Sequence, residues 1–563
     1  MFSQIIRKFV VLCLLLSLTT SLTAQQELKH RNAKLDTIFS HYTIGEKPGV
    51  SIAILEKDKP VFLKSYGHAN LEDQIKNTSN TLFNAADLAK QFTVFCILIL
   101  EDQGELSIND DIKKYVPELD ELSLDITLKY LMESTSGLRD VVDLRNWTGY
   151  QNGDVVTKQD IVALVAKQRR LNYPSGDKVE YNRTGYVLLT EVIEKVSGMP
   201  FSEFAKEHIF EPLGMENSVF VDSHSELTQN GSFSYAAKED GFTKIVNNTS
   251  FIGGTNLYTS TSDFAKWLQN MSEQKIGKPA FYEYLQTNVV LTNGESLGYT
   301  PGIYRDNRVG YWVVHLEGFD HGYSTYMMNV PEYDFSLIYF SNDVDFPAGD
   351  VYEYLYDWFH TDYSIALDEP FVAPPVKLAE QSTKELQKHT GDYLFEDGFS
   401  FRKVVLKNDT LFYARNEDNQ TAMVPIAGDH TFKILVPGTE NYRITFKNEG
   451  EVLEFRALSA KYANDYVTLG RKLKFCSARQ KAFSGDFRNE ALGHVINIRN
   501  LNGDIQLKIN DASVVFDQIG EDEFLPRSND KVQHLRLERD EQRNIIGVYL
   551  SGYQLKDLYY ELM

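Results

Sequence analysis

The residues best placed to do chemistry in this chain are an acid and an amine three positions apart, Asp87 and Lys90. They open an apolar stretch, residues 92–100, whose spacing predicts a helix, so one helical turn would put both side chains on the same face. A hydroxyl at position 87 could attack an acyl carbonyl with the lysine as its base. A carboxylate has no further proton to lose, so Asp87 predicts no ordinary acyl-enzyme. It could instead cap the helix or form a salt bridge.

The D-x-x-K frame resembles the S-x-x-K nucleophile motif of serine β-lactamases and penicillin-binding proteins, with Asp87 in place of the serine. A second stretch, residues 181–189, resembles Y-x-N followed by x-G-Y-x-L-L. Here Tyr181 matches the motif and Arg183 replaces the asparagine. Other stretches that resemble the family are residues 108–119, 135–138, 210–215 and 253–260, with Ser134 where the family usually has histidine. The resemblance covers about 300 residues.

The third family motif, H-x-G or K-T-G on an inner strand, has a candidate in residues 314–323. Matching Gly318 and Gly322 to the family glycines puts Leu316 where the histidine belongs, with His315 one residue early. A one-residue shift on a strand turns a side chain to the opposite face. An insertion in the following turn could instead keep His315 in place. His321 is expected to be a solvated loop histidine.

The resemblance implies that these changes meet in one pocket. In the family the middle asparagine points toward the serine and the lysine, so Arg183 could form a charge-assisted pair with Asp87 and keep Lys90 as an ammonium. Alternatively, Arg183 turns into solvent. Tyr181 remains as a donor. If Glu317 points away, the pocket should carry about one excess positive charge, which favours a small carboxylate such as the end of a D-amino-acid peptide.

Residues 1–24 have the layout of a signal peptide, with basic residues before a short apolar run, so we expect a secreted or periplasmic protein. No later segment is long and apolar enough to span a bilayer. The formal net charge of −22 argues against nucleic acid and anionic membranes as partners. Cleavage would leave only Cys96 and Cys476, far apart in the sequence, so we expect no disulfide and no cysteine-based metal site.

A boundary is predicted near residues 367–380, where prolines interrupt the chain before short alternating runs begin. The motif Gly391-Asp392-Tyr393 recurs as Gly485-Asp486-Phe487, and each copy is followed by several strand-like runs. We therefore expect a first domain over residues 25–366 and two small antiparallel β-barrel-like domains, over residues 381–475 and 476–563. This layout resembles penicillin-recognising peptidases and esterases with lipocalin-like C-terminal barrels.

The resemblance implies an α+β first domain, an antiparallel sheet with flanking helices and a helical subdomain, and a cleft between them. It also implies an ancestral serine hydrolase acting on D-amino-acid peptides, β-lactams or small esters, without a metal or another cofactor. We expect this chain to be catalytically impaired and to bind a small-molecule or peptide ligand. Two alternatives stay open: an active hydrolase with a rearranged site, and an interaction module that uses its β-domains.

Overall fold

The computed structural model describes most of residues 33–563. The parts of the chain outside the description are residues 1–32, 360–380, 459–465 and 474–482, together with shorter stretches in other loops. The predicted signal peptide therefore lies outside the described residues. So does most of the helix predicted from the pattern of residues 352–360.

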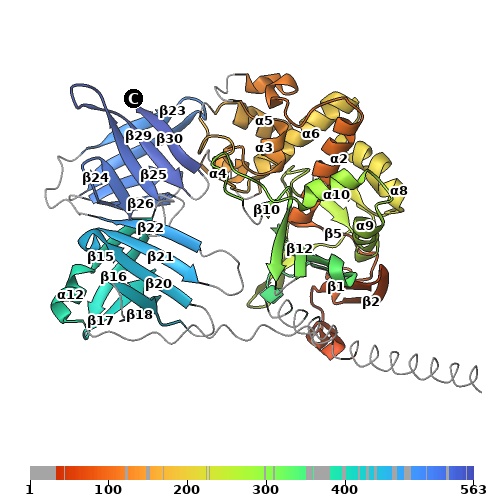
Figure 1. The fold of residues 1–563 in the computed structure, drawn as a ribbon. Coiled ribbons are helices and arrows are strands. Elements are labelled where there is room, and N and C mark those ends of the chain that lie inside the picture. Colours follow the sequence, from red (N-terminus) through yellow and green to blue (C-terminus); the bar gives the residue numbers. More distant parts are fainter. Residues whose placement is uncertain are drawn as a thin grey trace, which may run out of the picture.

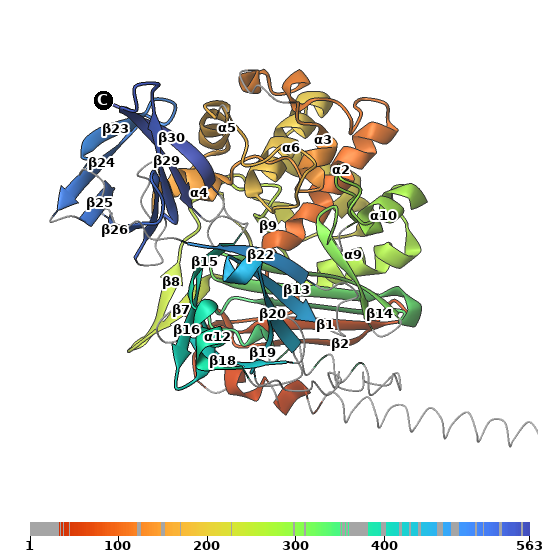
Figure 2. The same ribbon diagram turned by 60° about the vertical axis from the view of Figure 1, so that its left-hand side comes forward.

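A seven-stranded antiparallel sheet forms the centre of the first domain. Its order is β10 (Tyr299–Thr300), β11 (Ile303–Arg308), β12 (Tyr311–Asp320), β13 (Tyr323–Val330), β14 (Phe335–Ser341), β1 (Val50–Glu56) and β2 (Lys59–Tyr66). Strands β13 and β14 are buried at every residue, because separate apolar clusters cover the two faces of the sheet. Figures 1 and 2 show helices on one face of this sheet, and η1 (Ser40–Thr43) lies on the other.

The helices form the larger of the two clusters. They are α2 (Lys90–Asp102), α3 (Leu128–Met132), α4 (Val141–Trp147), α5 (Lys158–Ala166), α6 (Arg183–Ser197), α7 (Phe201–Ala205), α8 (Glu211–Leu213), α9 (Thr261–Glu273) and α10 (Pro279–Gln286). Nearly all residues of helix α2 are buried because other elements enclose it, and the ring of Phe92 lies 4.5 Å from the ring of Trp267 on α9. The helix predicted after Asp87 is therefore confirmed as a central core element.

Short strands and one-turn helices connect these elements. Three small sheets pair β3 (His68–Asn70) with β4 (Ile75–Lys76), β5 (Phe83–Asn84) and β6 (Val219–Phe220) with β9 (Leu257–Thr259), and β7 (Ser234–Lys238) with β8 (Gly241–Ile245). The one-turn helix η2 (Ala86–Ala89) leads directly into α2 and packs against β12 and β13. This contact brings the start of α2 to the edge of the hairpin that carries the third motif.

The C-terminal part forms two closed eight-stranded antiparallel barrels. Barrel 1 consists of β15 (Gly391–Phe395), β16 (Phe401–Lys407), β17 (Thr410–Ala414), β18 (Gln420–Pro425), β19 (Thr431–Ile434), β20 (Asn441–Lys447), β21 (Val452–Leu458) and β22 (Tyr466–Lys472). Barrel 2 consists of β23 (Gly485–Asn489), β24 (His494–Leu501), β25 (Asp504–Ile509), β26 (Ala512–Gln518), β27 (Glu523–Pro526), β28 (His534–Arg539), β29 (Ile545–Gly552) and β30 (Leu555–Leu562). Helix α12 (Thr383–Lys388) precedes the first strand of barrel 1.

Pairing of the first and last strands closes each barrel, β15 with β22 and β23 with β30, and this leaves no free sheet edge. The repeated Gly-Asp-aromatic motif begins the first strand of each barrel, at Gly391 and Gly485. The predicted α+β fold with two C-terminal barrels is thus confirmed. The exact domain limits predicted from the sequence stay predictions, because the connecting segments lie outside the described residues.

Candidate functional site

The acid and amine at the start of α2 form a buried ion pair. The Nζ atom of Lys90 lies 3.0 Å from Oδ1 of Asp87, and the two residues are 5% and 8% exposed. Neither η2 nor α2 has a side-chain cap, so Asp87 is not the helix cap that its sequence position allowed. Of the two structural roles considered for it, the salt bridge is the one that forms.

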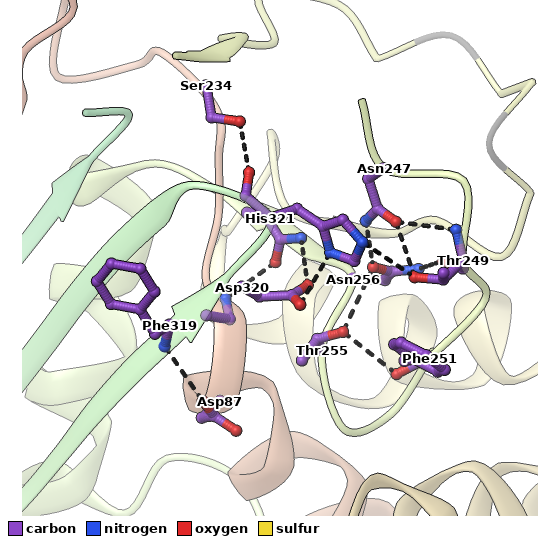
Figure 3. Close-up of polar contacts among 12 residues, drawn as sticks. Asp87, Ser234, Asn247, Thr249, Phe251, Thr255, Asn256, Phe319, Asp320 and His321 are labelled. Atoms are coloured by element: carbon purple, nitrogen blue, oxygen red, sulfur yellow. Dashed lines mark hydrogen bonds and ion pairs between the residues drawn. The ribbon is translucent and has the colours of Figure 1, made fainter. Parts of the chain in front are cut away.

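The third-motif hairpin supplies a second partner for the Asp87 carboxylate. The backbone N–H of Phe319 on β12 donates to Oδ2 of Asp87 over 3.2 Å, a contact marked by a dashed line in Figure 3. This approach requires a glycine next to Phe319, because a Cβ atom at Gly318 would lie 2.9 Å from the backbone nitrogen of Asp87. The carboxylate is therefore held by an ammonium on one oxygen and an amide on the other.

These contacts decide the ionisation of the pair. Burial raises the pKa of Asp87, but the charges of Lys90 and Arg183 and a hydrogen bond from Tyr181 outweigh burial and hold this pKa below its usual range. The pKa of Lys90 is lowered on balance. Burial lowers it most and the charge of Arg183 lowers it further, whereas the charge of Asp87 raises it. The Lys90 ammonium also lies 3.4 Å from the centre of the Tyr181 ring, a cation–π contact. Asp87 is thus a carboxylate at neutral pH and a weak base.

Arg183 is the first residue of α6, and its position is set by its backbone. The N-cap of α6 is Asn182, and the N–H of Arg183 donates to Oδ2 of Asp140 over 2.7 Å. Its guanidinium lies beside the rings of Tyr181 and Phe251, at 5.7 and 5.9 Å. Burial lowers the pKa of Arg183, but Tyr181 and nearby carboxylates outweigh burial and raise it, so the group is charged.

The predicted contact between Arg183 and Asp87 is not formed. Among the described residues no ion pair within 4.0 Å involves the Arg183 guanidinium, and Asp87 takes Lys90 as its close partner instead. Asp87 pairs with Lys90 because Lys90 is only one turn away along the chain. Arg183 interacts electrostatically with Asp140 and Asp320 as well as with Asp87. The Nε atom of Arg183 is buried and has no hydrogen-bond partner among the described residues. That leaves a charged donor in the site that a ligand could satisfy.

His315 lies on the face of the sheet that points away from Asp87. It stacks on Tyr304 of β11 and contacts Tyr326 of β13, with ring centres 5.9 and 6.3 Å away. Because side chains alternate along a strand, Leu316 and Gly318 share the face that contacts η2, and His315 cannot. Of the two alternatives that the sequence left open, the structure has the displaced one, with His315 on the face of the sheet opposite to Asp87.

Asp320 is a site residue that the sequence did not reveal. Asp320 is 6% exposed and accepts a hydrogen bond from the side chain of Asn84. Its negative charge raises the pKa of Arg183. The alternation along β12 could have identified it, because positions 316, 318 and 320 share one face. Glu317 does point away, being exposed on the opposite face. With Asp320 present, the single excess positive charge expected for the pocket is not there.

His321 is not the solvated loop residue expected from the sequence. Its side chain is 21% exposed, its Nδ1 lies 2.9 Å from Oδ1 of Asp320, and its Nε2 lies 3.5 Å from the hydroxyl of Thr249. Figure 3 shows the imidazole between these two groups. The Thr249 hydroxyl also donates to Asn247 over 2.9 Å. A carboxylate, an imidazole and a hydroxyl therefore lie next to one another, and the carboxylate also raises the pKa of Arg183.

The described residues contain no cluster of three histidine, cysteine, aspartate or glutamate side chains that could hold a metal ion. Cys96 is a buried free thiol on α2, and burial raises its pKa; Cys476 lies outside the described residues. Within the part of the chain that is described, no helix has the length and apolar character needed to cross a membrane.

Comparison with known proteins agrees with the architecture. A family model described as Beta-lactamase matches residues 35–361. Penicillin-binding protein 4* of Bacillus subtilis is 27% identical over 413 residues, which cover 69% of this chain and 87% of that protein. D-aminopeptidase of Gluconobacter oxydans is 25% identical over 52% of this chain, and the match spans only 56% of that enzyme.

A solved structure shares the fold. The octameric penicillin-binding protein homologue from Pyrococcus abyssi superposes with a TM-score of 0.52 at 22% identity, over 78% of this chain and 99% of that one. At this identity the likeness concerns the fold alone.

Proposed function

This chain belongs to the β-lactamase family, and on that premise we propose that it is an exported member that has lost acyl-enzyme chemistry and binds a small carboxylate ligand. The observation that carries the proposal is the state of Asp87. The residue at the nucleophile position is an ionised carboxylate, paired with Lys90 and bonded to the N–H of Phe319. It offers no hydroxyl to be acylated, and it occupies the two groups that would assist such a hydroxyl.

The ligand class follows from the groups that Asp87 does not neutralise. Arg183 is charged and has a buried, unsatisfied Nε donor, and a guanidinium suits the two oxygens of a carboxylate. Asp320 lies near Arg183 and would favour a ligand that also carries an ammonium. A D-amino acid or a short D-peptide with a free C-terminus has both features, and one relative is named a D-aminopeptidase.

Calorimetry with D-Ala-D-Ala, with a free and with an amidated C-terminus, tests this proposal. We expect binding of the free form that weakens with added salt, because a partly exposed ionic contact is screened over about 10 Å at 0.1 M ionic strength. Arg183→Leu should abolish the binding, whereas Arg305→Leu, on strand β11, should not. Equal binding of both forms, or of neither, would overturn the carboxylate assignment.

One observation favours a second candidate, an active hydrolase with a rearranged site. Thr249, His321 and Asp320 place a hydroxyl, an imidazole and a buried carboxylate next to one another, as an activated nucleophile requires. The hydroxyl donates to Asn247 and lies 3.5 Å from the imidazole, so it would have to turn toward His321 to be activated. A panel of p-nitrophenyl esters tests this reading. Hydrolysis that disappears in both Thr249→Val and His321→Gln would establish the alternative, and absence of turnover in the unmodified protein would remove it.

Export is part of the proposal and rests on the pattern of residues 1–24. Expression of the full chain followed by N-terminal sequencing of the mature protein tests it. A mature N-terminus at or close to Gln25 is expected, and recovery of the intact chain from the cytoplasm would contradict export.

A further inference from the structure

Barrel 2 contacts the first domain through the hairpin formed by β29 and β30. The backbone carbonyl of Lys556 on β30 accepts two hydrogen bonds from the guanidinium of Arg139, at 3.3 Å from Nε and 2.8 Å from Nη2. The N–H of Lys556 donates to the side chain of Asn172 over 2.9 Å. Figures 1 and 2 both place this barrel beside the helices of the first domain.

Arg139 depends on this contact. It is 4% exposed, and its remaining hydrogen bonds go to the side chain of Gln168 and the carbonyl of Arg170. Burial lowers its pKa to about 10, and no carboxylate among the described residues lies within ion-pair distance of it. A buried guanidinium that relies on neutral acceptors loses heavily when any of them leaves. Undocking the hairpin would remove two of its hydrogen bonds.

The next residue, Asp140, connects barrel 2 to the candidate site. It is 1% exposed; its Oδ1 accepts from the N–H of Val142 at the start of α4, and its Oδ2 accepts from the N–H of Arg183. Helix α4 in turn packs on barrel 2, because Leu144 and Trp147 belong to the same apolar cluster as the barrel interior.

A further hydrogen bond ties Arg139 itself to α6. The hydroxyl of Thr184, in the first turn of that helix, donates to the carbonyl of Arg139 over 2.8 Å. The dipeptide Arg139–Asp140 therefore contacts barrel 2 through its guanidinium and through α4, and it contacts the first turn of α6 through a carboxylate and a carbonyl.

We infer that barrel 2 is a working part of the candidate site: its last hairpin holds the Arg139–Asp140 dipeptide, which fixes the first turn of α6 and thereby positions Arg183. Arg139 is on this account a positioning residue. The inference rests on the proposed function only in treating Arg183 as a ligand contact. Coupling between two sites is reciprocal, so a ligand on Arg183 and docking of the hairpin should each favour the other.

Hydrogen–deuterium exchange of the full chain tests the inference without a ligand. Arg139→Lys keeps the charge but cannot bridge the same acceptors. We expect exchange about fivefold to tenfold faster, equivalent to losing about one hydrogen bond, in residues 545–562 and in residues 181–188 together. The C-terminal half of α6 should be unchanged, which separates positioning from general loosening. Arg499→Lys makes the same chemical change on the exposed surface of β24 and should alter neither segment.

Faster exchange confined to residues 545–562, with residues 181–188 unchanged, would overturn the inference, since the barrel would then be an attached module. A uniform increase over the whole first domain would also overturn it. If Arg139→Lys does not fold, Trp147→Ala loosens the barrel from α4 without touching Arg139, and the same two segments should respond together. Neither outcome depends on whether a D-peptide binds.

Discussion

At the scale of single residues, the carboxylate of Asp87 also changes the chemical roles open to Lys90 and to the backbone N–H of Phe319. An amine next to a nucleophile can serve as its base, and a backbone N–H aimed at the same point can stabilise an oxyanion. Here Lys90 and the N–H of Phe319 both contact the carboxylate of Asp87. The loss of acyl chemistry that we propose therefore involves the three groups together.

Replacing Asp87 with alanine should destabilise the protein by about 3–5 kcal/mol, because the buried Lys90 ammonium would be left without its counterion. Adding Lys90→Met to Asp87→Ala should recover a large part of this loss, since neighbouring residues are not additive. Chemical denaturation measures both effects. Asp125→Ala, which removes an exposed partner of Lys113, serves as the control and should cost about 1 kcal/mol or less. Additive costs for the two site substitutions would show that the pair does not stabilise the fold.

The sequence predicted the residues of this pair but not all of their partners. Asp87 on η2 and Lys90 at the start of α2 are one helical turn apart, so their spacing alone indicates that they meet. The contacts of Arg183 depend on Asp140 and Asp320, which come from distant parts of the chain, and no local pattern predicts which carboxylate a long side chain will approach. For the same reason the contact of His321 with Thr249 could not be predicted.

At the scale of elements, the site depends on how closely β12 approaches η2. The alternation of side chains along β12 decides which residues face Asp87. Two glycines in the sequence indicated that His315 would be displaced, but an insertion in the turn stayed open as an alternative, and only the structure decides between them. The sequence could not predict how closely β12 approaches η2, because packing between elements far apart in the chain sets this distance. Gly318 is the residue at which that contact is tightest.

Gly318→Ala should destabilise the protein by about 1–3 kcal/mol, the usual cost of inserting a methyl group into a packed interior. The added carbon would lie 2.5 Å from the Thr325 hydroxyl and 2.9 Å from the backbone nitrogen of Asp87, so β12 must move away from η2. Thermal unfolding measures the cost. Gly349→Ala is the control, because an added Cβ there meets no atom within 4 Å. Equal melting temperatures for the two variants would contradict the close approach.

At the scale of the whole molecule, the two barrels differ in their relation to the first domain. Barrel 2 shares an apolar cluster with α4 and accepts hydrogen bonds from Arg139 at a backbone carbonyl, whereas the apolar cluster inside barrel 1 contains residues of that barrel and of α12 but none of the first domain. The sequence predicted both barrels, because a repeated motif and alternating runs are local signals. It could not predict which of them docks, since that depends on a few residues in loops and turns.

Barrel 1 should lose stability in mild acid because of His389. This histidine is 1% exposed, is stacked on Phe446, and has no hydrogen-bond partner among the described residues for either ring nitrogen. Burial lowers its pKa to about 4 from 6.5. The unfolded chain therefore binds a proton first, and stability that is complete above pH 6.5 is lost as the pH falls toward 4, by at most about 3 kcal/mol.

Unfolding of the full chain followed between pH 7.5 and 4.5 checks this dependence, with barrel 1 monitored by hydrogen exchange. His389→Phe should remove the dependence in that barrel. His430→Asn removes a neighbouring positive charge that also lowers the pKa of His389, so it should weaken the dependence only in part. A slope that persists in His389→Phe would assign the acid sensitivity to another group.

The central claim is that position 87 supports no acyl-enzyme, and the intact mass of the mature protein after incubation with penicillin tests it most directly. The account predicts no mass increase in the unmodified protein at any time point. Asp87→Ser returns a hydroxyl beside Lys90 and Tyr181 and provides the comparison in which an adduct can form. A stoichiometric penicilloyl adduct on the unmodified protein would contradict the account.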